Sequence, residues 1–207
     1  MDRKSVLILI LFILVGCNNP NNPAFYYPVT FLGKNYYRSD EFGMVRPIKP
    51  RFRLANPEPY QLKKGDNVDT TAIYINKDKY FNHKGIPSVI FLRFFGDGHC
   101  AFGSLYKDSL QYNAPSSEWG AGYYKMLNPN EFQLEIFQAH SKVVANYENS
   151  RGIIKGDTIY VFSHMYEKDK TPIIPKDYKK WTREKENLEC YMYLKQKVDT
   201  LTGTPDW

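Results

Sequence analysis

GYYKMLNPNEFQLEI, residues 122–136, contains the pattern of two strands joined by a tight turn. Residues 131–136 alternate polar and apolar side chains, which is the period of a strand buried on one face. Asn128, Pro129 and Asn130 suit a turn, because proline fixes its own φ and asparagine tolerates left-handed backbone angles. The segment therefore predicts a hairpin with Gln133 and Glu135 facing solvent and with Phe132, Leu134 and Ile136 facing inward.

Similar strand patterns lie on both sides of this hairpin. The other predicted strands are residues 70–75, 88–95, 99–105, 143–147 with an extension to 154, 158–163 and 188–194. Gly96-Asp97-Gly98 and Lys155-Gly156-Asp157 supply turns between neighbouring strands. The charged segment 166–187 contains two prolines and predicts a short helix around residues 177–186.

About eight strands thus follow one another with short links, which predicts an all-β sandwich or barrel. We favour an antiparallel up-and-down barrel, because the links are hairpin-like and closure removes exposed strand edges. The barrel domain is expected at residues 69–207. Residues 29–68 are expected to form an extended arm, since they contain four prolines and only short apolar pieces, such as RFRL at 51–54.

The start of the chain has the pattern of a bacterial export signal. Arg3 and Lys4 precede a ten-residue apolar run, which is too short to span a bilayer as a helix. The run ends in Leu14-Val15-Gly16-Cys17, which resembles the lipobox of bacterial lipoproteins. The resemblance implies that residues 1–16 are removed and that Cys17 carries fatty acyl chains, such as palmitate.

Acyl chains at Cys17 would anchor the protein stably in a membrane. Residues 17–28 begin with an Asn-rich run that buries nothing, so they predict a flexible, lipid-anchored tether. The residue after the cysteine is Asn18 rather than aspartate. In the lipoproteins that this signal resembles, that difference implies the outer membrane, and it leaves the periplasmic or the outer face open.

A second resemblance concerns the barrel. The run from Gly122 through Phe132 and Tyr147 to Ile159 is similar to small bacterial lipoproteins with a lipocalin-like barrel. It covers roughly the last two-thirds of the chain by pattern. The resemblance implies a fold and no particular activity.

The net charge is +6, which is modest. We interpret it as spread along the chain, consistent with solubility and mild attraction to anionic surfaces. Because no focused basic stripe is evident, nucleic acid is not expected as a partner.

Few residues have the spacing that catalysis or metal binding needs. None of the four histidines has a partner at metal-ligand spacing, so no metal and no cofactor are expected. Asp97-Gly98-His99 places an acid beside a base, but a turn aspartate usually bonds to its own backbone. The serines lack a nucleophile elbow, and no Gly-rich loop is present to hold phosphate. We therefore expect no enzyme.

Two thiols remain after lipidation, at Cys100 and Cys190. Two buried free thiols are favoured over a disulfide, because the strands that carry them need not be adjacent. Cys190 shares one face of its strand with Leu188, Met192 and Leu194, which predicts that it lies inside the barrel. Cys100 follows a hairpin turn and is expected nearer the rim, where it would be the more reactive thiol.

The sequence leaves two roles open for such a barrel. In the first, the barrel binds a small apolar ligand, and the candidate lining residues are Trp119, Gly122, Tyr124 and Tyr160. In the second, side chains fill the barrel, and its surface contacts an envelope protein. The same aromatic side chains also suit ordinary sheet packing, and glycine in a strand also marks a bend or bulge.

Overall fold

A computed structural model describes residues 36–38, 45–47, 51–76, 78, 80–81, 87–106, 120–139, 145–178, 184–185, 187–198 and 201–202. The chain divides into two compact units, Met1–Lys49 with Ala139–Asn146, and Pro50–Gln138 with Tyr147–Trp207. In the first unit, β1 (Tyr36–Arg38) pairs antiparallel with β2 (Val45–Pro47). The second unit contains the barrel.

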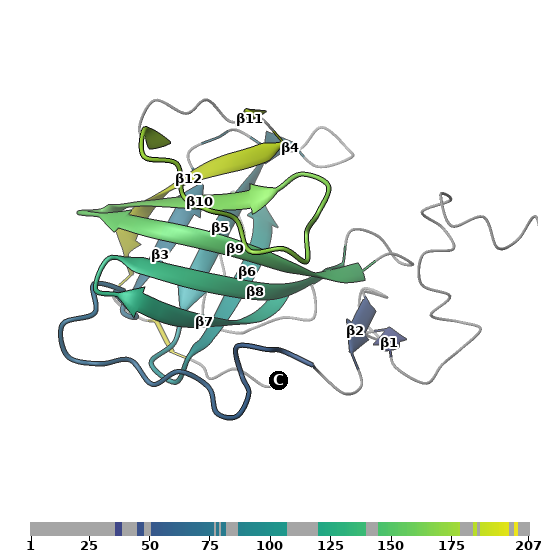
Figure 1. Cartoon of the computed structure of the whole chain (residues 1–207), viewed down its shortest axis with the longest axis horizontal. Coiled ribbons are helices and arrows are strands. Elements are labelled where there is room, and N and C mark those ends of the chain that lie inside the picture. Colours follow the sequence, from purple (N-terminus) through teal and green to yellow (C-terminus); the bar gives the residue numbers. More distant parts are fainter. Residues whose placement is uncertain are drawn as a thin grey trace, which may run out of the picture. The chain divides into compact units, whose positions relative to one another are not determined.

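Eight strands form one closed antiparallel barrel (Figure 1). In order around the barrel they are β3 (Ala72–Asn76), β5 (Pro87–Phe94), β6 (His99–Tyr106), β7 (Gly120–Asn128), β8 (Glu131–Ala139), β9 (Ala145–Lys155), β10 (Thr158–His164) and β12 (Leu188–Lys197). Each strand pairs with the next, and β12 pairs with both β10 and β3, which closes the barrel. The predicted all-β, up-and-down barrel of about eight strands is confirmed.

Two short strands lie beside the barrel strands. β4 (Tyr80–Phe81) pairs with β5, and β11 (Glu184–Lys185) pairs with β12. The second of these corrects the expectation of a helix around residues 177–186, since the described part of that segment contains a strand. Residues 179–183 and 186 lie outside the described residues.

Inward-facing side chains fill the barrel, because successive residues of each strand point alternately in and out. The ring of Phe94 packs edge-on against Tyr74, Tyr124 and Phe132, with centroids 5.5, 5.0 and 5.3 Å away. A Cβ added at Gly152 would lie 2.1 Å from the Phe132 ring, so this glycine makes room for that ring. The interior cluster comprises Val68, Tyr74, Leu92, Phe94, Cys100, Tyr124, Met126, Phe132, Leu134, Ile136, Ile154, Ile159, Val161 and Tyr193.

Residues 60–68 lie against this interior cluster. Tyr60 and Leu62 pack on it, and Val68 belongs to it. The backbone N–H of Leu62 donates to the carbonyl of Gly96 (3.0 Å). A Cβ at Gly98, whose φ is +85°, would lie 2.3 Å from the Tyr60 carbonyl oxygen, so only glycine allows this close approach.

Three segments cover parts of the outer face of the barrel. Residues 51–56 lie over β7 and β8, where Phe52 contacts Tyr123 and the Leu54 N–H donates to Glu135. Near the C-terminus, Val198 and Leu201 pack on Ile73, Phe91 and Ala101, and the Arg93 guanidinium donates to the Thr202 carbonyl (2.7 Å). After β10, Ile174 and Tyr178 pack on a small cluster, which comprises Ile153, Phe162, Leu188 and Cys190.

Cys190 therefore lies on the outer face of the barrel wall, which corrects the prediction that it lies inside the barrel. β12 pairs with β10 so that Tyr193 lies opposite Ile159 and Tyr191 opposite Val161, which directs both tyrosines inward. Leu188 and Cys190 consequently face outward, and both are buried only because the segment after β10 covers them. Leu194, on the same face but beyond that cover, is 43% exposed.

Candidate functional site

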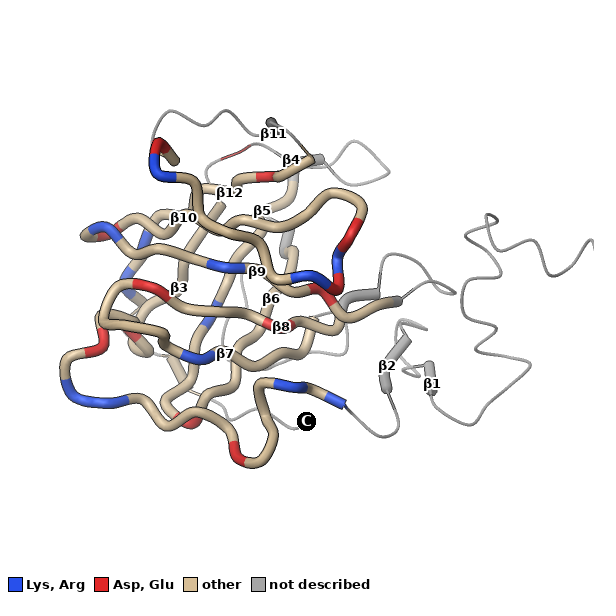
Figure 2. The backbone as a smooth tube through the Cα atoms, in the orientation of Figure 1, with Lys and Arg blue, Asp and Glu red and all other residues tan. Residues whose placement is uncertain are grey.

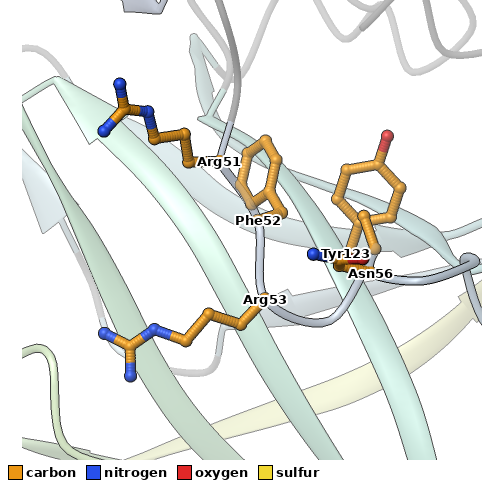
Figure 3. Close-up of a pocket in the computed structure, with 6 residues that line it drawn as sticks. Arg51, Phe52, Arg53, Asn56 and Tyr123 are labelled. Carbon is orange, nitrogen blue, oxygen red and sulfur yellow. The ribbon is translucent and has the colours of Figure 1, made fainter.

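A hollow in the described part of the molecule lies outside the barrel. It is an open cleft of about 510 Å³, lined by Arg51, Phe52, Arg53, Ala55, Asn56 and Tyr123 (Figure 3). Residues 51–56, here called the strap, supply all of these except Tyr123, which lies on β7. The cleft exists because the strap crosses the outer face of the barrel wall.

Phe52 fixes the strap to that wall. Its side chain is buried, and its ring lies 4.9 Å from the Tyr123 ring and 5.1 Å from the Tyr147 ring. Phe137 lies 5.0 Å from Tyr147 on the same outer face. The strands thus present an aromatic patch outward, and one strap residue covers it.

Glu135 provides a second attachment, and its burial corrects the prediction that it faces solvent. It does face away from the interior, but the strap covers it, and it is only 1% exposed. Its Oε2 accepts a hydrogen bond from the Leu54 N–H (3.0 Å). Burial raises the pKa of the Glu135 carboxyl, although the N–H groups of Leu54 and Arg53 and the Arg53 charge act in the opposite direction.

Tyr147 provides a third attachment. Its hydroxyl oxygen accepts a hydrogen bond from the Arg51 N–H (3.0 Å). The backbone on both sides of Phe52 is therefore bonded to the barrel wall, through Arg51 and Leu54.

Two of the strap residues, Arg51 and Arg53, are cationic. Figure 3 shows both side chains extending to the same side of the strap, away from Tyr123 and Asn56. Both residues are exposed, and neither guanidinium makes an ion pair with another described residue. Guanidinium groups match the geometry of carboxylate and phosphate oxygens, so this arrangement suits an anion.

Asp97 and His99 lie beside the other edge of Tyr123. The His99 ring packs on Tyr123 with centroids 4.4 Å apart, and its Nδ1 lies 3.0 Å from Asp97 Oδ1. The same carboxylate oxygen accepts a hydrogen bond from the His99 N–H (3.3 Å). This is the local turn bonding expected for an aspartate two residues before its partner, and it orients the imidazole against the tyrosine.

The structure describes three of the four predicted ligand-binding residues, and it does not bring these three together at one site. Tyr124 lies in the interior cluster, where its hydroxyl donates to the Phe95 carbonyl (2.8 Å). A Cβ at Gly122 would lie 2.6 Å from the Glu135 carbonyl oxygen, so this glycine allows close strand packing. Tyr160 faces outward against Tyr178 (5.3 Å). Trp119 and the predicted lipid-attachment residue Cys17 lie outside the described residues.

Sequence reasoning missed the strap as a site. The only signal was the alternation Arg51-Phe52-Arg53-Leu54, which places two cations on one side and two apolar side chains on the other. Nothing in that alternation identifies the strands that the strap covers.

No group of three or more His, Cys, Asp or Glu side chains in the described part of the chain is placed to hold a metal ion. The same residues include no helix with the length and apolarity needed to cross a membrane. In comparisons with known proteins, the chain matches no family model, no curated protein and no solved structure at a significant level.

Proposed function

We propose that the protein is a non-enzymatic, lipid-anchored interaction protein of the cell envelope, and that its barrel serves as a scaffold for outward-facing contacts. The observation that carries the proposal is the packed interior cluster, in which the Phe94 ring packs edge-on against three other aromatic rings. A drug-sized ligand needs a pocket of about 300–1,000 Å³. A cleft of about 510 Å³ lies on the outer face, beside the strap.

The anchor is the second part of the proposal. Acyl chains at Cys17 would hold the protein at the outer membrane, and the Asn-rich residues that follow would act as a tether. A role limited to binding and positioning agrees with the local turn bonding of the Asp97–His99 pair.

Two measurements test the proposal. The Cys17→Ser variant should leave the membrane fraction while keeping the melting temperature of the barrel, and a variant that stays in the membrane pellet contradicts the anchor. An uncharged apolar dye, N-phenylnaphthylamine, should show no saturable binding to the purified protein. Saturable binding would overturn the scaffold role and favour the rival one, a barrel that holds a small apolar ligand.

A further inference from the structure

We propose that Arg51 and Arg53 form a contact site for the anionic phosphate headgroups of the membrane surface. The inference extends the proposed function, because it rests on the lipid anchor to keep the domain near a membrane. It assigns a partner to the cationic side of the strap.

The first argument is the way in which the strap presents its charges. Arg51 and Arg53 extend to the same side, whereas the Phe52 ring between them packs on the barrel wall (Figure 3). Two neighbouring guanidinium groups facing one way can engage separate phosphates or share one. Each guanidinium also binds phosphate oxygens through paired N–H donors.

The second argument is that the backbone that carries the two arginines is held firmly. The Arg51 N–H is bonded to the Tyr147 hydroxyl and the Leu54 N–H to the Glu135 carboxylate, and Phe52 is only 5% exposed. Binding then orders only the two long side chains and not the backbone. A fixed backbone lowers the ordering cost of a contact.

The third argument is where the excess charge lies. Residues 24–54 contain six basic and two acidic side chains, whereas residues 55–207 contain twenty basic and nineteen acidic ones. Figure 2 shows both signs mixed along the barrel strands and loops. This count corrects the interpretation that the charge is spread evenly, because the excess is concentrated between the predicted tether and the barrel.

The fourth argument concerns the type of partner. Cations near an anionic leaflet attract its phosphates within about one Debye length, so a weak contact matters only for a protein that is already held there. The predicted anchor at Cys17 supplies that proximity. A freely diffusing anionic solute receives no such help from the tether.

The test uses the full chain with Cys17→Ser, so that acyl chains contribute nothing to vesicle binding. Co-sedimentation is measured with phosphatidylcholine vesicles that contain or lack phosphatidylglycerol. The double variant Arg51→Gln/Arg53→Gln is compared with Lys63→Gln/Lys64→Gln, which removes the same charge from two exposed residues elsewhere. Any contribution from residues 1–16 is common to both variants and cancels.

We expect the arginine variant to bind phosphatidylglycerol vesicles about 30-fold more weakly, since each near-surface cation contributes roughly a factor of five. The lysine variant should lose much less, and Arg51→Lys/Arg53→Lys should recover most of the binding. Equal losses in the arginine and lysine variants, or binding that does not depend on phosphatidylglycerol, would overturn the proposal.

Two further measurements separate the alternatives. Inorganic phosphate, added at constant ionic strength, should compete poorly, and strong competition would mean that the arginines bind a soluble anion rather than a surface. Fractionation of the protein with Cys17 intact tests the anchor separately. If the protein with Cys17 intact is soluble, the proposed anchor is contradicted. If its Cys17→Ser form still binds these vesicles through the arginines, the proposed contact is supported without the anchor.

Discussion

The two faces of β8 are both buried, but for different reasons. Phe132, Leu134 and Ile136 point inward and belong to the interior cluster. Glu135 and Phe137 point outward and are equally buried, at 1% and 0% exposure, although the first of them is a carboxylate. The inner face is covered by the interior cluster, whereas the strap covers the outer face at Glu135. Burial on the first face follows from local alternation, whereas burial on the second follows from a segment about eighty residues away in sequence.

The largest expected effect is a change on the inner face. Leu134→Ala should lower the free energy of unfolding by about 2–5 kcal/mol, because the interior has little freedom to collapse into the cavity. Chemical denaturation measures this loss. Lys125→Ala, an exposed position on the adjacent strand, is the control and should change stability by less than about 0.5 kcal/mol. Similar losses in both variants would contradict the assigned register.

The outer face should respond less strongly. Phe52→Ala should cost about 1–3 kcal/mol, because the strap can detach while the barrel stays closed. Hydrogen exchange should then accelerate at the Leu54 amide, which donates to Glu135. Glu58→Ala, at an exposed position just beyond the strap, is the matched control. A loss as large as that of Leu134→Ala, without faster exchange, would mean that strap and barrel unfold as one unit.

The two thiols allow a chemical comparison of the inner and outer faces of the barrel wall. Both are free and buried, as predicted, but Cys100 belongs to the interior cluster and Cys190 to the small outer cluster. Burial raises the pKa of the Cys190 thiol to about 12 and also raises that of Cys100. We expect Cys190 to be alkylated about tenfold faster, because only a surface segment covers it. This reverses the order expected from the sequence, and faster labelling of Cys100 would contradict it.

The smallest effect concerns the pH dependence at Glu135. Because the folded state raises this pKa above 4.5, the folded state binds more protons than the unfolded state, and stability falls as pH rises from there through the raised pKa. Glu135→Gln should remove this decline, by about 1.4 kcal/mol for each unit of elevation. Urea unfolding between about pH 4 and pH 8 measures the difference. Parallel curves for the two proteins would mean that the carboxyl is not perturbed.

The strands themselves could be predicted from the sequence. Period-2 alternation, β-branched and aromatic residues and Gly- or Asn-containing turns are all local signals, and each barrel strand carries at least one of them. The same local signals do not predict that Tyr191 and Tyr193 face the barrel interior. The last strand has apolar side chains on both faces, so local pattern alone does not indicate which face enters the barrel. The register with β10 decides this, and register is a property of the pair.

The cleft was less predictable than the fold. Its strap residues and Tyr123 are far apart in sequence. The strap is held by the packing of Phe52 on an aromatic patch, and that patch exists only after three strands have paired. Similarly, Glu135 has the sequence pattern of an ordinary exposed carboxylate. The N–H groups of Leu54 and Arg53 and the Arg53 charge, all supplied from outside the sheet, explain how a carboxyl group can be buried there.

The pairing of β12 with β3 has a consequence for how the chain folds. These strands begin at Leu188 and Ala72, so the seam joins segments separated by more than one hundred residues. Proteins dominated by such distant pairings fold slowly. During synthesis β3 is made long before β12, so one edge of β3 stays unpaired until the final strand is complete. An unpaired strand edge can pair with other chains. Truncation before Leu188 should therefore cause aggregation, whereas the intact chain completes its own sheet.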